Sequence, residues 1–285
     1  MFTSGHKTVT AEEIVDKIRG VCRDNGQSDD IGTILKALND VTDLFIGKRK
    51  GFQRCDVRYH DFSHSLQTVI PFVDIIDGWN KNGTPPKISK EYFDLGVIAV
   101  LLHDTGYIKK EDDVEGTGAK YTFAHIRRSI DFAGQYLRGI GFDVHKIKTV
   151  QNAIKCTDPA IRFRDIPFEC DEERIIAYAL GTADLLSQMS AADYSEKLSV
   201  LYHEFREAYQ YEGLEKLRSS GVRTYRNAKE LINSTGEFYN KTVLDRLRGM
   251  NSLYNCISYH YGGLRNPYIE AIEKNIKKIQ SSLVL

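Results

Sequence analysis

Hydrophobic side chains recur along most of the chain at intervals of three and four residues, the spacing of one helix face. In the first such segment, Ile14, Ile18 and Val21 follow Thr10-Ala11-Glu12-Glu13, which has the spacing of an N-terminal capping box. The same periodicity predicts further helices over residues 31–45, 63–79, 90–103, 124–137, 144–156, 172–188, 193–211, 242–261 and 267–283. No segment of useful length alternates as a strand would. The pattern therefore predicts an all-α fold.

Two segments lack this periodicity. Residues 110–120 carry Gly116 and Gly118 after a run of acidic residues, and residues 219–227 look equally irregular. The first follows the most apolar stretch of the chain, where a mobile lid over a substrate would be useful. A plain surface loop is the alternative. A boundary near Ala191 predicts a core of residues 1–190 and C-terminal helices of residues 191–285 that pack on it, with one continuous domain as the alternative.

Composition limits the partners. Hydrophobic residues make up 41% of the 285 residues, which is typical of a soluble globular protein with a sizeable core. Lys and Arg together number 39, as do Asp and Glu, so no overall field favours nucleic acid or a membrane, and a small-molecule partner is expected. The cysteines are odd in number and scattered, residues 1–10 lack an apolar signal segment, and the longest apolar run is too short to span a bilayer. We therefore expect a cytoplasmic protein; a homo-oligomer is compatible with the sequence.

Candidate metal ligands lie at two places in the first half of the chain. His60 and His64 are four residues apart, so on a helix they share one face. His103 and Asp104 end the apolar stretch of residues 93–102. Adjacent side chains diverge on a helix, so His103 can face one ion while Asp104 bridges toward a second. Because imidazole suits zinc, iron, manganese and nickel, and carboxylates suit magnesium and manganese, the pattern predicts one or two divalent metal ions.

Asp184 is the fourth candidate ligand. It follows Ile176 and Leu180 in steps of four, which places it on an apolar helix face. A carboxylate there costs several kcal/mol unless a charge or a metal compensates it. A buried salt bridge and a solvated edge are the alternatives.

These motifs resemble the ligand set of the HD superfamily of metal-dependent phosphohydrolases. Tyr59-His60-Asp61-Phe62-Ser63-His64 is similar to the Tyr-His-Asn-x-x-His motif of class I cyclic nucleotide phosphodiesterases, which are HD-type proteins. The resemblance covers residues 58–188 and implies an HD-domain or phosphodiesterase-like helical bundle. It departs from the family at Asp61, where asparagine is usual. It also departs after the dyad, where Thr105-Gly106-Tyr107 replaces the family's His-Asp-x-Asp-His extension.

The resemblance also implies roles. His60 would be the general acid that protonates the leaving oxygen, and His64, His103, Asp104 and Asp184 would form the first metal site. Asp104, by bridging to a second ion, would be catalytic as well as a ligand. A phosphoester of a nucleotide or cyclic nucleotide would then be hydrolysed by a hydroxide shared between the ions.

Further residues are assigned around this set. Many HD proteins use a third histidine after the dyad at the second ion, which implies this role for His125; an ordinary helix-surface histidine is the alternative. Where some relatives carry a fourth histidine, this chain has Cys156. Asp61 is a candidate to orient His60 or a ligand. Three cations are candidate phosphate partners, with solvated surface charges as the alternative: Lys109, Arg127 and Arg128.

Two other functions fit parts of the same pattern. Some HD proteins are di-iron oxygenases, which generally need four histidines and two aspartates around the metals. A non-catalytic sensor that binds a metal or a nucleotide without turnover is the third hypothesis. The charged segment of residues 202–207, which includes His203, is interpreted as a solvated helix face.

Overall fold

The computed structural model describes residues 9–263 and 265–281. Its helices confirm the all-α prediction, and the described residues contain no strand, only an isolated bridge between Phe52 and Lys110. The helices are α1 (Ala11–Asp24), α2 (Gly32–Phe45), α3 (Phe62–Asn82), α4 (Lys90–Leu102), α5 (His125–Gly139), α6 (Val144–Lys155), α7 (Asp171–Ser190), α8 (Tyr194–Glu212), α9 (Leu214–Ser219), α10 (Ala228–Phe238), α11 (Leu244–Gly249), α12 (Ile257–His260) and α13 (Pro267–Ser281).

Polar side chains fix where several helices begin. Thr10 and Glu13 form the capping box expected at α1, with Thr10 Oγ1 accepting from the Glu13 amide at 3.2 Å. Asp61 caps α3 by accepting from the His64 amide at 3.0 Å, and Asp143 caps α6 through the Lys146 amide at 2.9 Å. These short-range bonds satisfy amides that have no partner within the helix.

The C-terminal third departs from the sequence prediction. The helix expected over residues 242–261 is interrupted, because Asn251 and Ser252 adopt positive φ angles of 57° and 51°. The chain therefore ends α11, turns and resumes in α12. The helices α9 and α10 were not predicted. Asn227 is the N-cap of α10 and accepts from the Glu230 amide at 2.9 Å. The irregular segment of residues 219–227 therefore ends at this cap.

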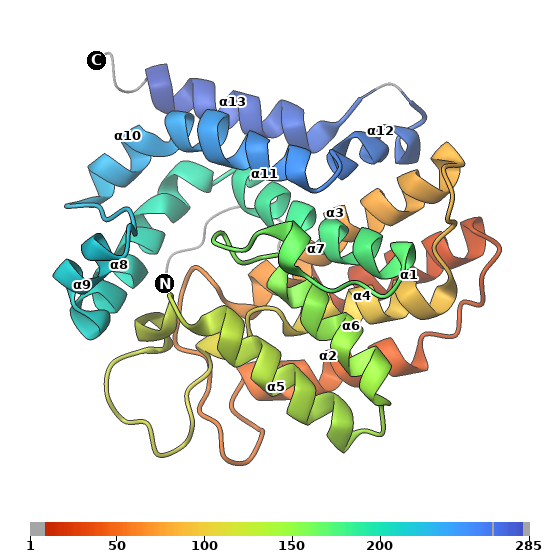
Figure 1. The fold of residues 1–285 in the computed structure, drawn as a ribbon, viewed down its shortest axis with the longest axis horizontal. Coiled ribbons are helices and arrows are strands. Elements are labelled where there is room, and N and C mark those ends of the chain that lie inside the picture. Colours follow the sequence, from red (N-terminus) through yellow and green to blue (C-terminus); the bar gives the residue numbers. More distant parts are fainter. Residues whose placement is uncertain (1–8, 264, 282–285) are drawn as a thin grey trace.

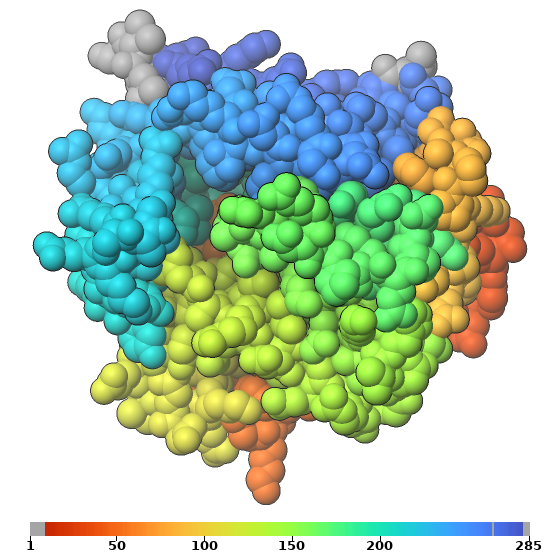
Figure 2. Space-filling model, viewed as in Figure 1, coloured from red at the N-terminus to blue at the C-terminus, as the bar shows by residue number. Residues whose placement is uncertain are grey.

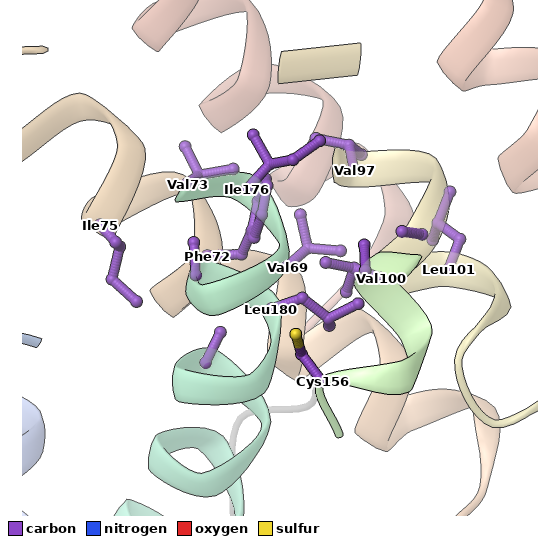
Figure 3. Close-up of a cluster of buried hydrophobic side chains, with 14 of the residues drawn as sticks. Val69, Phe72, Val73, Ile75, Val97, Val100, Leu101, Cys156, Ile176 and Leu180 are labelled. Carbon is purple, nitrogen blue, oxygen red and sulfur yellow. The ribbon is translucent and has the colours of Figure 1, made fainter. Parts of the chain in front are cut away.

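The helices α3, α4 and α7 pack on one another at the centre of the molecule through aliphatic side chains. α5 lies along one edge of the view in Figure 1 and α10 and α13 along the opposite edge, with α8 and α9 at a third side. Figure 3 shows the central cluster, which includes Val69, Phe72, Val100, Cys156, Ile176 and Leu180. These side chains are almost fully removed from solvent, so their packing fixes the three helices relative to one another.

One cluster of buried hydrophobic residues runs from Ile14 to Ile279, across the predicted boundary near Ala191. α13 packs against α7, on the other side of that boundary. The division into two units stays a prediction. No helix within the described ranges has the length and apolar character needed to cross a membrane.

The segment of residues 110–120, a candidate lid by its sequence, is held by several hydrogen bonds. Gln53 Nε2 donates to the carbonyls of Lys110 at 2.9 Å and Asp113 at 2.7 Å. Thr117 donates to Glu207 of α8 through both its amide and its hydroxyl. The structure therefore favours the alternative, a fastened surface loop.

A second buried polar cluster joins α3 to α12 on the side of α3 away from His64. His260 contacts two fully buried carboxylates, with Nε2 3.1 Å from Asp74 Oδ1 and Nδ1 2.5 Å from Asp77 Oδ2. Lys17 and Lys81 also pair with these aspartates. Burial alone would raise the pKa of Asp77, but hydrogen bonds from His260, Lys81 and Asn25 lower it. The cluster therefore stabilises the contact between the two helices.

Gly78 allows α12 to approach α3, because a Cβ atom there would lie 1.9 Å from the Cys256 carbonyl oxygen. We expect Gly78→Ala to lower the free energy of unfolding by about 2 kcal/mol or more, since a rigid backbone atom must move. Gly20→Ala is the matched control, because no atom lies within 4 Å of its added Cβ in α1. It should raise stability by about 0.5–1 kcal/mol. Urea unfolding followed by circular dichroism measures both, and equal stability of the two variants would contradict the close approach.

Candidate metal centre

The four candidate ligands come together from three helices. His64 lies in the first turn of α3, His103 and Asp104 follow α4, and Asp184 lies in α7. His64 Nε2 lies 3.0 Å from Asp184 Oδ1 and 3.5 Å from Asp104 Oδ2. His103 Nε2 lies 3.2 Å from Asp104 Oδ2 and 3.7 Å from Asp184 Oδ1. One nitrogen or oxygen of each residue therefore faces the same small volume.

The central packing explains this convergence. His103 lies three residues after Val100, and Asp184 lies four residues after Leu180, so each polar side chain is one turn beyond a residue of the core. His64 lies at the start of α3, five residues before Val69 of the same core. Once the aliphatic side chains interlock, the polar side chains near the end of α4, at the start of α3 and within α7 must share one site.

The geometry fits a metal ion. Ligand atoms about 2.1 Å from a metal lie about 3.0–3.4 Å from one another around a tetrahedral or octahedral ion, close to the separations found here. His103 Nε2 and Asp104 Oδ2 are buried and have no hydrogen-bond partner within the described residues. Leaving a buried polar atom unpaired costs about 1–3 kcal/mol. Cations compensate such atoms, and a mixed imidazole and carboxylate set suits a divalent transition metal.

Charge in the site leads to the same inference. Burial alone would raise the pKa of Asp104, but the neighbouring imidazoles of His103, His60 and His64 lower it. For His103 the balance is reversed: burial alone would lower its pKa, but Asp104 and Asp184 raise it well above its ordinary value. Two buried carboxylates therefore need positive charge beside them. A proton on His103 can supply it, and a divalent ion can supply more while displacing that proton.

Asp104 also faces a third histidine, as the bridging role requires. Its Oδ2 faces His64 and His103, whereas its Oδ1 lies 3.7 Å from His125 Nε2. His125 Nδ1 donates to the Thr122 carbonyl at 2.7 Å, which leaves Nε2 free to face Asp104. Burial lowers the pKa of His125 and favours the neutral imidazole that can bind a metal. The two oxygens of Asp104 can therefore face two ions.

Gly106 allows the dyad to lie this close to α5. A Cβ on Gly106 would meet the His125 carbonyl oxygen at 1.9 Å, and the Gly106 amide donates to Ser129 Oγ at 2.8 Å. Cys156, at the position where some relatives carry another histidine, lies in the aliphatic core beside Leu180 (Figure 3). His125, and not Cys156, therefore lies beside Asp104.

His60 lies before α3 rather than on it, so the expectation that it shares a helix face with His64 is wrong. Asp61, between the two, caps the helix instead. The two imidazole rings nevertheless lie 6.0 Å apart between centroids, and His60 is also 6.0 Å from the His125 ring. The Tyr107 ring lies nearly parallel to both, at 4.6 Å from His60 and 4.5 Å from His125. The extended segment before α3 thus brings His60 to the edge of the cluster.

Glu204 of α8 holds His60 in place. Its Oε2 lies 2.8 Å from His60 Nδ1, and its Oε1 accepts from the amides of Arg58 at 2.9 Å and Tyr59 at 2.7 Å. Burial alone would lower the pKa of His60, but the hydrogen bond and charge of Glu204 raise it, with Asp104 and Asp184 adding to the effect. His60 is therefore held with a preference for the protonated form, and Nε2 is the nitrogen left for other contacts.

The role of Glu204 differs from the prediction for residues 202–207, whose charged side chains are typical of a solvated helix face. His203 and Arg206 are indeed exposed, but Glu204 is 5% exposed. The signal for Glu204 was helical spacing, since it lies three residues after Leu201 and four before Ala208, on the apolar face of α8. A carboxylate on that face requires a buried partner.

The structure gives other partners to two of the three candidate phosphate-binding cations. Lys109 Nζ lies 3.2 Å from Asp56 Oδ2 and donates to the Gly116 carbonyl at 2.6 Å. Arg128 donates to the carbonyls of Gly106 and Ile108 at 2.6 and 2.9 Å, which fixes the turn after the dyad. We therefore withdraw these two assignments. Arg127 is exposed in the first turn of α5 and remains a candidate.

Access to the cluster is limited. The side chains of Asp184 and His125 keep 13% and 16% exposure, whereas those of His103 and Asp104 keep 2%. Figure 2 shows the surface hollowed where the cyan α8, the yellow-green chain leading into α5 and the green segment before α7 meet. The elements around this hollow include those that carry Glu204 and His125.

Comparison with known proteins does not assign the chain to a family. No protein-family model matches the chain, and no curated protein matches it. The chemistry of the chain is therefore inferred from the geometry of the metal centre and from the motifs in its sequence.

We expect His103→Ala and Asp104→Ala to abolish metal retention, since each removes a ligand atom that has no other partner. His145→Ala is the control, because His145 is exposed on α6 and contacts Glu169 and Tyr92 instead. Metal content after gel filtration, measured by plasma mass spectrometry, should fall to background in the first two variants only. Unchanged metal content in both would place any ion elsewhere.

Proposed function

We propose that this protein is a metal-dependent phosphohydrolase that acts on a phosphoester of a small molecule, with nucleotides and cyclic nucleotides as the expected class. The observation that carries the proposal is the buried pair His103 Nε2 and Asp104 Oδ2. Neither atom has a hydrogen-bond partner among residues 9–263 and 265–281, and both lie within reach of His64 and Asp184. The resemblance of these positions to the HD superfamily supports the same reaction.

The ligand residues have distinct roles in this proposal. His64, His103, Asp104 and Asp184 would hold the first ion, and Asp104 with His125 would hold a second. Divalent ions there would neutralise phosphoryl charge and lower the pKa of a bound water. The chain fixes its ligands through their other atoms, as His103 does when Nδ1 donates to the Val100 carbonyl at 2.7 Å. Rigid ligands hold the substrate phosphorus in one orientation.

His60 supplies the proton in this scheme. Glu204 accepts from Nδ1, so the imidazolium is stabilised and Nε2 carries the proton that can be transferred. As the bond to the leaving oxygen breaks, that proton moves from His60 Nε2 to the oxygen. The near-parallel Tyr107 ring limits rotation of the imidazole, which keeps the donor aimed at one position.

A second candidate is the di-iron oxygenase. The predicted ligands include three histidines, one fewer than such oxygenases generally need. In the structure, however, the His60 ring centroid lies 6.0 Å from those of both His64 and His125. With His60 included, four histidines and two aspartates surround the site. The hydrogen bond to Glu204 favours the acid role for His60, because a metal ligand needs no proton on Nε2.

The decisive experiment measures turnover against phosphomonoesters, cyclic mononucleotides and nucleoside triphosphates with several divalent metals. We expect phosphate release that stops with chelator and returns when metal is added. Oxygen consumption with iron, without phosphate release, would identify the oxygenase instead. Metal binding without any turnover across the panel would indicate the non-catalytic sensor.

A second prediction separates the role of Glu204 from a merely structural one. His60→Ala should keep the metal and lower kcat by about 10²–10⁴, the usual contribution of a general acid. Glu204→Gln should lower kcat by about 10–100-fold, with little change in KM. In the His60→Ala background, Glu204→Gln should have no further effect, because it acts through the imidazole.

Glu212→Gln is the control for this cycle, since Glu212 also lies on α8 but pairs with the exposed Lys216. It should leave kcat unchanged. Full activity in His60→Ala would remove the acid assignment, and additive losses in the double variant would show that Glu204 acts independently of His60.

A further inference from the structure

A cavity of about 410 Å³ lies next to the candidate metal centre but is not part of it. Three segments form its walls: residues 56–58, which precede His60, residues 117–119, and one face of α8. Glu204 lines the cavity, whereas His60 and the candidate ligands do not. A molecule in the cavity would therefore meet the residues that position His60 without entering the metal centre.

Three basic side chains line this cavity: Arg58, His203 and Arg206. All three residues are exposed, and their side chains have no hydrogen bond or ion pair with any residue in the ranges that the structure describes. Arg58 belongs to a fixed stretch of backbone, because its amide donates to Glu204 at 2.9 Å. Cations held around one concave surface without internal partners are available to an external anion.

The acidic side chains of the same cavity are, by contrast, already bonded within the protein. Asp56 accepts from the Gly118 amide at 2.7 Å and pairs with Lys109. Glu204 accepts from His60 and two backbone amides. Glu207 accepts from the amide and hydroxyl of Thr117. Lys109 compensates the negative charge of Asp56, and His60 compensates that of Glu204. The positive charges of Arg58 and Arg206 therefore exceed the remaining negative charge of Glu207.

We propose that this cavity is a second binding site that takes a phosphate group, either as the free ion or on a small organic molecule. Arginine guanidinium groups present paired N–H donors that match phosphate oxygens, and two of them with a histidine suit a tetrahedral dianion. Val57, Ala119 and Val200 give the cavity an apolar part that can contact the organic portion of an ester. The site is separate from the proposed catalytic centre and does not depend on the proposed reaction.

The test uses the full-length protein after chelator treatment, so that no metal can bind phosphate at the other site. Isothermal titration with inorganic phosphate and with glycerol 3-phosphate should show saturable binding to the wild type. The double variant Arg58→Gln/Arg206→Gln should bind at least about tenfold more weakly, since both charge-assisted contacts are lost. Arg138→Gln is the matched control, because Arg138 is an exposed arginine at the end of α5. This variant should bind phosphate with the same affinity as the wild type.

Hydrogen exchange locates the ligand. Bound phosphate should slow exchange at the amides of Arg58 and Tyr59, because both donate to Glu204, which lines the cavity together with Arg58. Tighter binding of glycerol 3-phosphate than of phosphate identifies an ester as the better ligand, and equal affinity identifies the free ion. The proposal is overturned by absence of binding at millimolar concentration, by equal affinity of the double variant, or by protection at residues 103–105 in place of residues 58–59.

Discussion

The packing of α3, α4 and α7 forces four polar side chains into one buried volume, and the candidate site depends on that constraint. The aliphatic residues of these helices fill the space between them, so the turns that follow cannot separate. Two carboxylates of the site, Asp104 and Asp184, are removed from most solvent as a result. Buried carboxylates destabilise a fold unless cations compensate them. In this cluster the imidazoles of His64 and His103 lie beside both carboxylates and can supply that positive charge.

Three of the four histidines in the cluster, His60, His103 and His125, are held in a similar way. Each uses Nδ1 in a hydrogen bond away from the cluster and leaves Nε2 toward it. The acceptor differs, however: His103 and His125 donate to backbone carbonyls, whereas His60 contacts the carboxylate of Glu204. A neutral carbonyl fixes the ring while leaving its basicity for a metal, and a carboxylate stabilises the charged ring. The carboxylate acceptor raises the pKa of His60, which suits the proposed proton donor.

Local sequence rules predicted most of the helices before α9. The capping box at Thr10 and the periodic apolar residues act over a few residues, so they can be read from the sequence. The interruption at Asn251 and Ser252 could not be predicted in this way, because a helical pattern of side chains continues through the turn. The prediction of a fully helical segment failed there, since tertiary packing of α12 against Gly78 overrides local propensity.

The candidate site likewise includes residues that the sequence predicts and contacts that only the fold shows. Residue type and spacing indicated His64, His103, Asp104 and Asp184 as candidate metal ligands, and the family resemblance added His125. Asp61, a candidate to orient His60 or a ligand, caps α3. Only the fold showed that Glu204 contacts His60. Only the fold showed that Lys109 pairs with Asp56 and donates to a backbone carbonyl, and that Arg128 donates to backbone carbonyls. The sequence determined the helices and the inventory of donor atoms, because both follow from neighbouring residues. The tertiary structure decided which donors meet, because contacts between residues 60 and 204 depend on how distant helices pack.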